Sequence, residues 1–97
     1  MAKVQVDSEL KEILPTFLKN RENDCHQLKE LIEAGDLAGV KKIGHKVSGS
    51  SGGYGFKELG EIAKNIELAA ESGDQEKASK LIESFVNYVQ TIEVEYI

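Results

Sequence analysis

The chain has 97 residues, of which 40% are hydrophobic and 30% are charged. We expect a single small domain over residues 1–97 with one core and no room for an enclosed active site. A formal net charge of −5 would repel the phosphate backbone of nucleic acids, which makes them improbable partners.

The N-terminal third is expected to be helical from Val6 to Ala34, because its apolar residues recur at steps of three and four. Asp7 or Ser8 can cap the start of this segment. Pro15 has no backbone N–H and disfavours helical geometry at the residue before it, so we expect a break near residues 13–16. The break would separate a short N-terminal helical extension from a longer helix.

Two similar tetrapeptides, Glu33-Ala34-Gly35-Asp36 and Glu71-Ser72-Gly73-Asp74, are expected to join helices. Each can end one helix with a left-handed glycine and cap the next with an aspartate. Between them we expect a helix over residues 37–51, a glycine-rich turn at residues 52–53 and a further helix from about residue 55 to residue 73.

A last helix is expected after Asp74, with an apolar stripe that continues to Ile92 and Tyr96. Short connections between long amphipathic helices favour antiparallel neighbours. The predicted fold is therefore all-α, an antiparallel up-and-down four-helix bundle with the N-terminal helical extension and no strand.

Cysteine content and hydropathy limit the cellular setting. Cys25 is the only cysteine, so no internal disulfide can form, and its spacing from His26 and His45 is not that of a zinc site. No apolar stretch approaches the roughly 20 residues that span a bilayer, and the N-terminus lacks the pattern of a signal peptide. We expect a cytoplasmic protein that does not contact membranes.

His45 is the residue with the clearest chemical potential. At 100° per residue it points about 140° away from the apolar stripe of the helix over residues 37–51, so we expect it to be exposed. Gly44 faces inward and should let another helix approach closely. Around His45 lie residues at helical steps of three, four and seven. They are Ala38, Lys41, Lys42, Ser48, Gly49 and Gly52.

This surface suits the exchange of a phosphoryl group with another protein. A neutral imidazole is a nucleophile that can carry a phosphoryl group, and Lys41 and Lys42 can supply the cation that helps the transfer. Ala38, Gly49 and Gly52 are small enough to admit a partner, and Gly49 costs roughly 1 kcal/mol of helix stability relative to alanine. The face has no carboxylate cluster for Mg²⁺, so we expect no cofactor of its own and any Mg²⁺ to come from the partner.

The sequence resembles a histidine-containing phosphotransfer (HPt) domain. The resemblance is carried by His45, Gly49 and Gly55 at offsets of zero, four and ten, followed by Leu59 and Ile66-Glu67. It extends over nearly the whole chain through the Asp-x-x-Leu opening, Pro15-x-Phe17-Leu18 and Gly35-Asp36.

The resemblance implies a four-helix bundle without kinase activity of its own. Family members relay phosphoryl groups between aspartates of receiver domains through one exposed histidine, which corresponds to His45. The implied partners are a response-regulator receiver domain, a hybrid sensor kinase or both, in two-component signalling. We expect the chain to be a monomer.

Ser48 departs from the family pattern, which usually has lysine three residues after the histidine. A charge-assisted hydrogen bond is worth roughly 1.5–3 kcal/mol, so its loss would slow transfer about ten- to a hundredfold unless another group compensates. Lys41 and Lys42 are candidates, with Ser48 itself as a third phosphoryl-stabilising residue. Lys46 ranks last because it points about 100° from His45 around the helix.

Glu67 has two readings. In some relatives a glutamate on the following helix accepts the hydrogen bond of the non-reacting imidazole nitrogen, and Glu67 stands at the matching place. It would then orient His45 and set its tautomer. The alternative is a solvated carboxylate on a helix face, the commoner role of glutamate. Glu58, Lys29 and Lys64 are also expected to be solvated charges on helix faces.

The departure at Ser48 keeps a second function open, that of a helical adaptor which docks receiver or kinase domains without phosphoryl transfer. Such an adaptor would tolerate His45→Gln with binding intact. A homodimerising bundle is a third possibility, but it would require an apolar stripe beyond those that the core uses, and none is evident.

Overall fold

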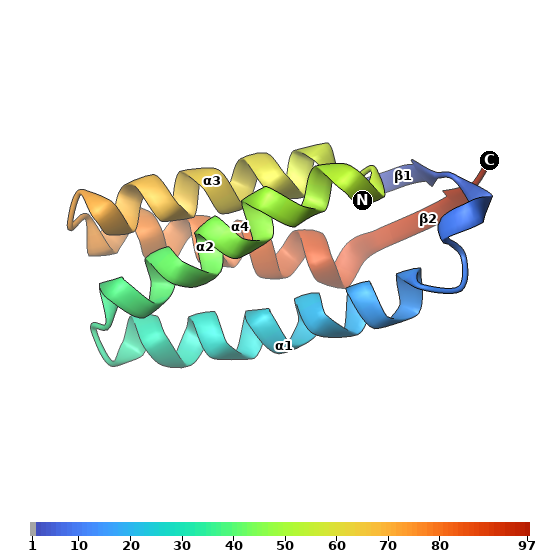
Figure 1. Ribbon diagram of the computed structural model, residues 1–97. Helices are drawn as coiled ribbons and strands as arrows, with labels where there is room; N and C mark the ends of the chain where they lie inside the picture. The colour runs from blue at the N-terminus through green and yellow to red at the C-terminus, as the bar shows by residue number, and fades with distance from the viewer. Residues whose placement is uncertain (1) are drawn as a thin grey trace.

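The computed structural model describes residues 2–97 and contains four main helices. They are α1 (Leu14–Glu33), α2 (Leu37–Ser51), α3 (Lys57–Glu71) and α4 (Gln75–Thr91). Successive helices run in opposite directions along the long axis, and both chain ends lie toward the same end of the bundle (Figure 1). The predicted up-and-down four-helix bundle is confirmed.

The joints between the helices form as their sequences predict. Gly35 and Gly73 have φ values of +72° and +77°, a left-handed conformation that side chains disfavour. The side chain of Asp36 accepts a hydrogen bond from the backbone N–H of Gly39, and Asp74 repeats this arrangement at the start of α4. These joints end α1 and α3 and begin α2 and α4.

The N-terminal extension is helical only over one 3₁₀ turn, Ser8–Leu10, which Asp7 caps by accepting from the backbone N–H of Glu9. The regular helix α1 begins at Leu14 with Pro15 in its first turn. This confirms the predicted break near residues 13–16, because proline needs no N–H partner at the start of a helix.

Segments near the two ends of the chain form strands, so the prediction of no strand, and of a last helix that continues to Tyr96, is wrong. β1 (Ala2–Val6) pairs in parallel with β2 (Ile92–Tyr96), so α4 ends at Thr91 instead of continuing to Tyr96. Apolar and polar residues alternate along both segments, the pattern of a strand with one covered face. Val4 and Val6 are accordingly buried against the bundle end.

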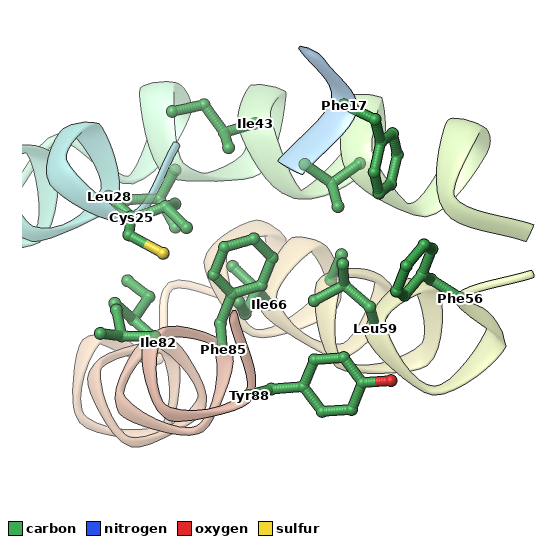
Figure 2. Packing of buried hydrophobic residues seen from close by; sticks show 14 of the residues in the cluster. Phe17, Cys25, Leu28, Ile43, Phe56, Leu59, Ile66, Ile82, Phe85 and Tyr88 are labelled. Carbon is green, nitrogen blue, oxygen red and sulfur yellow. The ribbon is translucent and has the colours of Figure 1, made fainter. Parts of the chain in front are cut away.

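The core fills the space between the helices with aliphatic and aromatic side chains from all four of them. Figure 2 shows Cys25 and Leu28 of α1 close to Ile82 of α4, and Phe56 beside Leu59 at the start of α3. The ring of Phe17 stacks on those of Tyr54 and Phe56, with centroids 4.3 and 5.2 Å away. The aromatic stack anchors the turn between α2 and α3 to α1.

At Gly44, α2 packs closely against the backbone of α3. A Cβ atom at this position would lie 2.8 Å from the carbonyl oxygen of Ala63 and 2.9 Å from the backbone nitrogen of Glu67, both on α3. The expected role of Gly44 in admitting a neighbouring helix is confirmed. Because α2 and α3 pack closely at Gly44, the next residue, His45, lies beside α3.

No helix within residues 2–97 is both long enough and apolar enough to cross a membrane.

Candidate functional site

His45 lies on the surface of α2, with 75% of its side chain exposed. The exposure predicted from the helical phase is therefore confirmed. The neighbouring inward positions Ile43, Gly44 and Val47 are buried and hold this stretch of α2 against the bundle. The imidazole thus projects from a rigid helix at the junction between α2 and α3.

Glu67 of α3 contacts the imidazole of His45. Its Oε2 lies 2.9 Å from Nδ1 of His45, while its Oε1 accepts a hydrogen bond of 3.2 Å from the ammonium of Lys64. Glu67 is only 7% exposed. The reading of Glu67 as a solvated carboxylate is wrong, because the close packing of α2 at Gly44 covers this part of α3.

The charge state of Glu67 determines how it binds the ring. Desolvation by burial disfavours its ionised form, but the hydrogen bonds and positive charges of Lys64 and His45 outweigh this effect and lower the pKa of Glu67 below its usual value. An ionised carboxylate can only accept hydrogen bonds, so Nδ1 of His45 must carry the proton. In the neutral form of the ring, this leaves the lone pair on Nε2.

Nε2 of His45 makes no hydrogen bond to any residue between 2 and 97. It combines an available lone pair, exposure to solvent and a ring orientation set by a buried partner. Such an atom can attack an electrophilic centre presented by another molecule without an enclosed pocket.

The predicted phosphoryl-stabilising residues differ in what they contact. The hydroxyl of Ser48 donates to the backbone carbonyl of His45 at 3.0 Å, so its single proton is engaged in the resting structure. The ammonium of Lys41 lies 3.9 Å from a carboxylate oxygen of Glu71. Lys42 is exposed and forms no ion pair with a described residue.

Lys46, ranked last from the helical phase, faces the other side of α2. Its ammonium lies 3.1 Å from Oδ1 of the buried Asp24, on α1. Asp24 also accepts a hydrogen bond from the buried Arg21 at 2.8 Å. Lys46 therefore belongs to a cluster between α1 and α2, away from Glu67.

The predicted docking positions Ala38, Gly49 and Gly52 are all exposed on α2 or at its end. A Cβ atom at Gly49 or Gly52 would meet nothing within 4 Å. The surface beside His45 is therefore open at both glycines, and nothing within the bundle requires their lack of a side chain.

Lys64 is the residue that sequence reasoning did not connect with the site. It was grouped with the solvated charges, yet the structure joins it to His45 through the two oxygens of Glu67. The available signal was its spacing from Glu67, since residues three apart on a helix share a face. That signal identifies a pair on α3 but not its position beside α2.

The described residues contain no group of three or more histidine, cysteine, aspartate or glutamate side chains that could hold a metal ion. The site is thus built from one imidazole, one buried carboxylate and the surrounding lysines.

Comparison with known proteins agrees with this geometry. The family model described as "Hpt domain" matches residues 12–95 of the chain. The match includes all four helices of the bundle and every residue of the site. No significant match was found among curated proteins or solved structures.

Proposed function

The chain belongs to the Hpt domain family, whose function is histidine phosphotransfer in phosphorelays, and we propose that His45 is the residue that carries the phosphoryl group. In this proposal the group moves between aspartates of receiver domains, or from a kinase to a receiver. The observation that carries the proposal is the exposed imidazole whose Nδ1 is held 2.9 Å from the buried carboxylate of Glu67.

The proposed step is a displacement at phosphorus. The lone pair of Nε2 attacks the phosphorus of an aspartyl phosphate, an N–P bond forms, and the bond from phosphorus to the aspartate oxygen breaks with its electron pair on the leaving carboxylate. The ring keeps its proton on Nδ1 and becomes cationic. Glu67 would stabilise that cation, and the reverse step would phosphorylate the next receiver.

The receiver is proposed to cover the α2 surface around His45. Gly49, Gly52 and Ala38 would admit its backbone, while Lys41 and Lys42 would steer its acidic site toward the imidazole. The Mg²⁺ that assists the reaction would be bound by the receiver.

Ser48 supports the second candidate, an adaptor that docks receiver or kinase domains without accepting the phosphoryl group. Its hydroxyl is turned to the backbone of His45 and brings no positive charge to the site. The two candidates share the docking surface and differ in the chemistry of one atom, Nε2 of His45.

The deciding experiment mixes the purified chain with phosphorylated receiver domains and Mg²⁺. Intact mass and acid lability would detect one added phosphoryl group, and His45→Gln is the control. Acid-labile phosphate that disappears in the control supports the carrier. Receivers that bind the chain but never phosphorylate it would favour the adaptor.

A further inference from the structure

A shallow hollow of about 300 Å³ lies on the surface between α2 and α3. It is lined by Ser48, Gly52, Lys57, Gly60, Glu61 and Lys64. Two of these residues are glycines and one is a serine, so the hollow exists because α2 and α3 place small residues where they face each other.

Two of the residues that line the hollow are linked to His45. Ser48, one helical turn beyond His45, is bonded to its carbonyl oxygen, and Lys64 shares the carboxylate of Glu67 with its ring. The lining holds two lysines and a single glutamate, Glu61, and one of the lysines, Lys64, binds the carboxylate that holds the ring of His45.

The ammonium groups of the other lysines near His45 contact other carboxylates or form no ion pair with a described residue. The ammonium of Lys46 is bonded to Asp24 on α1, and the ammonium of Lys41 lies 3.9 Å from a carboxylate oxygen of Glu71. Lys64 is the lysine whose ammonium is joined to the imidazole through a common carboxylate. Its side chain is 54% exposed, so it can move toward a group on Nε2 without unfolding the helix.

We propose that Lys64 is the cation that stabilises the phosphoryl oxygens during transfer through His45. The inference rests on the proposed carrier function and deepens it by naming the group that offsets the developing charge. Charge in the transition state spreads over three phosphoryl oxygens. The ammonium has three donors, so it can bind one of these oxygens and keep its hydrogen bond to Glu67.

A small phosphoryl donor, potassium phosphoramidate, tests this without a partner protein. Nε2 forms the N–P bond, the donor's P–N bond breaks, and ammonia leaves with the electron pair. The rate of phosphohistidine formation is followed by intact mass, with His45→Gln as the blank. We expect Lys64→Gln to slow the reaction about ten- to a hundredfold and Lys64→Arg to retain most of the rate.

Lys46→Gln is the matched control. Its side chain is 57% exposed and its ammonium is also bonded to a buried carboxylate, at 3.1 Å compared with 3.2 Å for Lys64. Loss of a surface lysine of this kind should leave the rate within about twofold of wild type if it plays no part in the transfer. Equal rates for the two glutamine variants would overturn the proposal.

A second variant separates a direct role of Lys64 from an indirect one through Glu67. Ser48 borders the same hollow, so a lysine there returns a cation to it. Ser48→Lys should restore most of the rate lost in Lys64→Gln, while ¹⁵N shifts of the imidazole show an unchanged His45 tautomer. A changed tautomer without rescue would mean that Lys64 acts only by holding Glu67, which overturns the proposal.

The outcomes also distinguish this inference from the carrier function. A wild-type chain that gains no acid-labile phosphate from phosphoramidate or from phosphorylated receivers would overturn both. A wild-type chain that is phosphorylated on His45, with Lys64→Gln equally fast, would overturn the role of Lys64 alone.

Discussion

Replacing Gly44 by alanine tests the contact that brings His45 to α3. The added Cβ would lie 2.8 and 2.9 Å from backbone atoms of Ala63 and Glu67, closer than such atoms normally approach. Because both contacts are with helix backbone, α2 and α3 must move apart. Overpacking of this kind costs about 1–3 kcal/mol, and we expect the upper end here because no flexible side chain can yield.

Gly49→Ala is the matched control for the effect of alanine on the helix itself. A Cβ at this position meets nothing within 4 Å, so only the gain in helix propensity of about 1 kcal/mol remains. The same gain applies at Gly44, where it leaves a net destabilisation of about 2 kcal/mol. The two variants should therefore differ by about 3 kcal/mol in the free energy of unfolding.

Urea denaturation followed by far-UV circular dichroism measures this difference. For a chain of this size, a net loss of about 2 kcal/mol corresponds to a melting temperature about 8–16 °C lower. Phosphohistidine formation should also slow in Gly44→Ala, because separation of α2 from α3 lengthens the hydrogen bond between His45 and Glu67. If Gly44→Ala and Gly49→Ala are stabilised equally, a Cβ atom at position 44 does not push α2 and α3 apart, and the reasoning is refuted.

Three further predictions concern other parts of the structure. Gly49→Leu should impair phosphoryl transfer from a receiver without lowering the urea midpoint, because the side chain enters open space and leucine favours a helix more than glycine does. Equal loss of transfer and stability would contradict the docking surface. Asp24→Ala should lower the free energy of unfolding by about 3–5 kcal/mol, because it leaves the charge of the buried Arg21 unpaired. Lys46→Gln should lower it by at most about 1 kcal/mol. Similar urea midpoints for these two variants would refute this reasoning. Burial, with the charge of Asp24, raises the pKa of Cys25 from 9.0 to about 11, so a disulfide reagent should react far more slowly with the native thiol than with the unfolded one. As pH rises, the thiol ionises in the unfolded chain before it ionises in the native one. The stability contributed by Cys25 is therefore present below pH 9 and is lost between about pH 9 and pH 11. If the native and unfolded thiols react equally fast with the reagent, Cys25 is not shielded.

The helices and their joints could be predicted from the sequence because local rules determine them. Apolar residues at steps of three and four, a proline in the first turn of α1 and the Gly-Asp pairs at two joints each act within a few residues. The exposure of His45 followed from the same helical period. Each of these predictions needed no knowledge of which helix lies next to which.

The strands show where that reasoning fails. Ile92, Val94 and Tyr96 can continue a helical stripe, but they also alternate with Glu93 and Glu95 as a strand requires. The choice depends on β1, which is far away in the chain and pairs with β2 at the end of the bundle. A local pattern could not decide between the two structures because the partner strand decides it.

The sequence by itself determined the four helices apart from the end of α4, their bundle architecture and an exposed histidine beside small and basic residues. Only the tertiary structure decided that Glu67 is buried against His45, that Lys64 binds the same carboxylate and that a hollow opens between α2 and α3. These features arise where two helices meet, and Gly44 sets how closely they meet. Helical period gives the direction of a side chain from its own axis, whereas the neighbour it contacts depends on how separate helices pack.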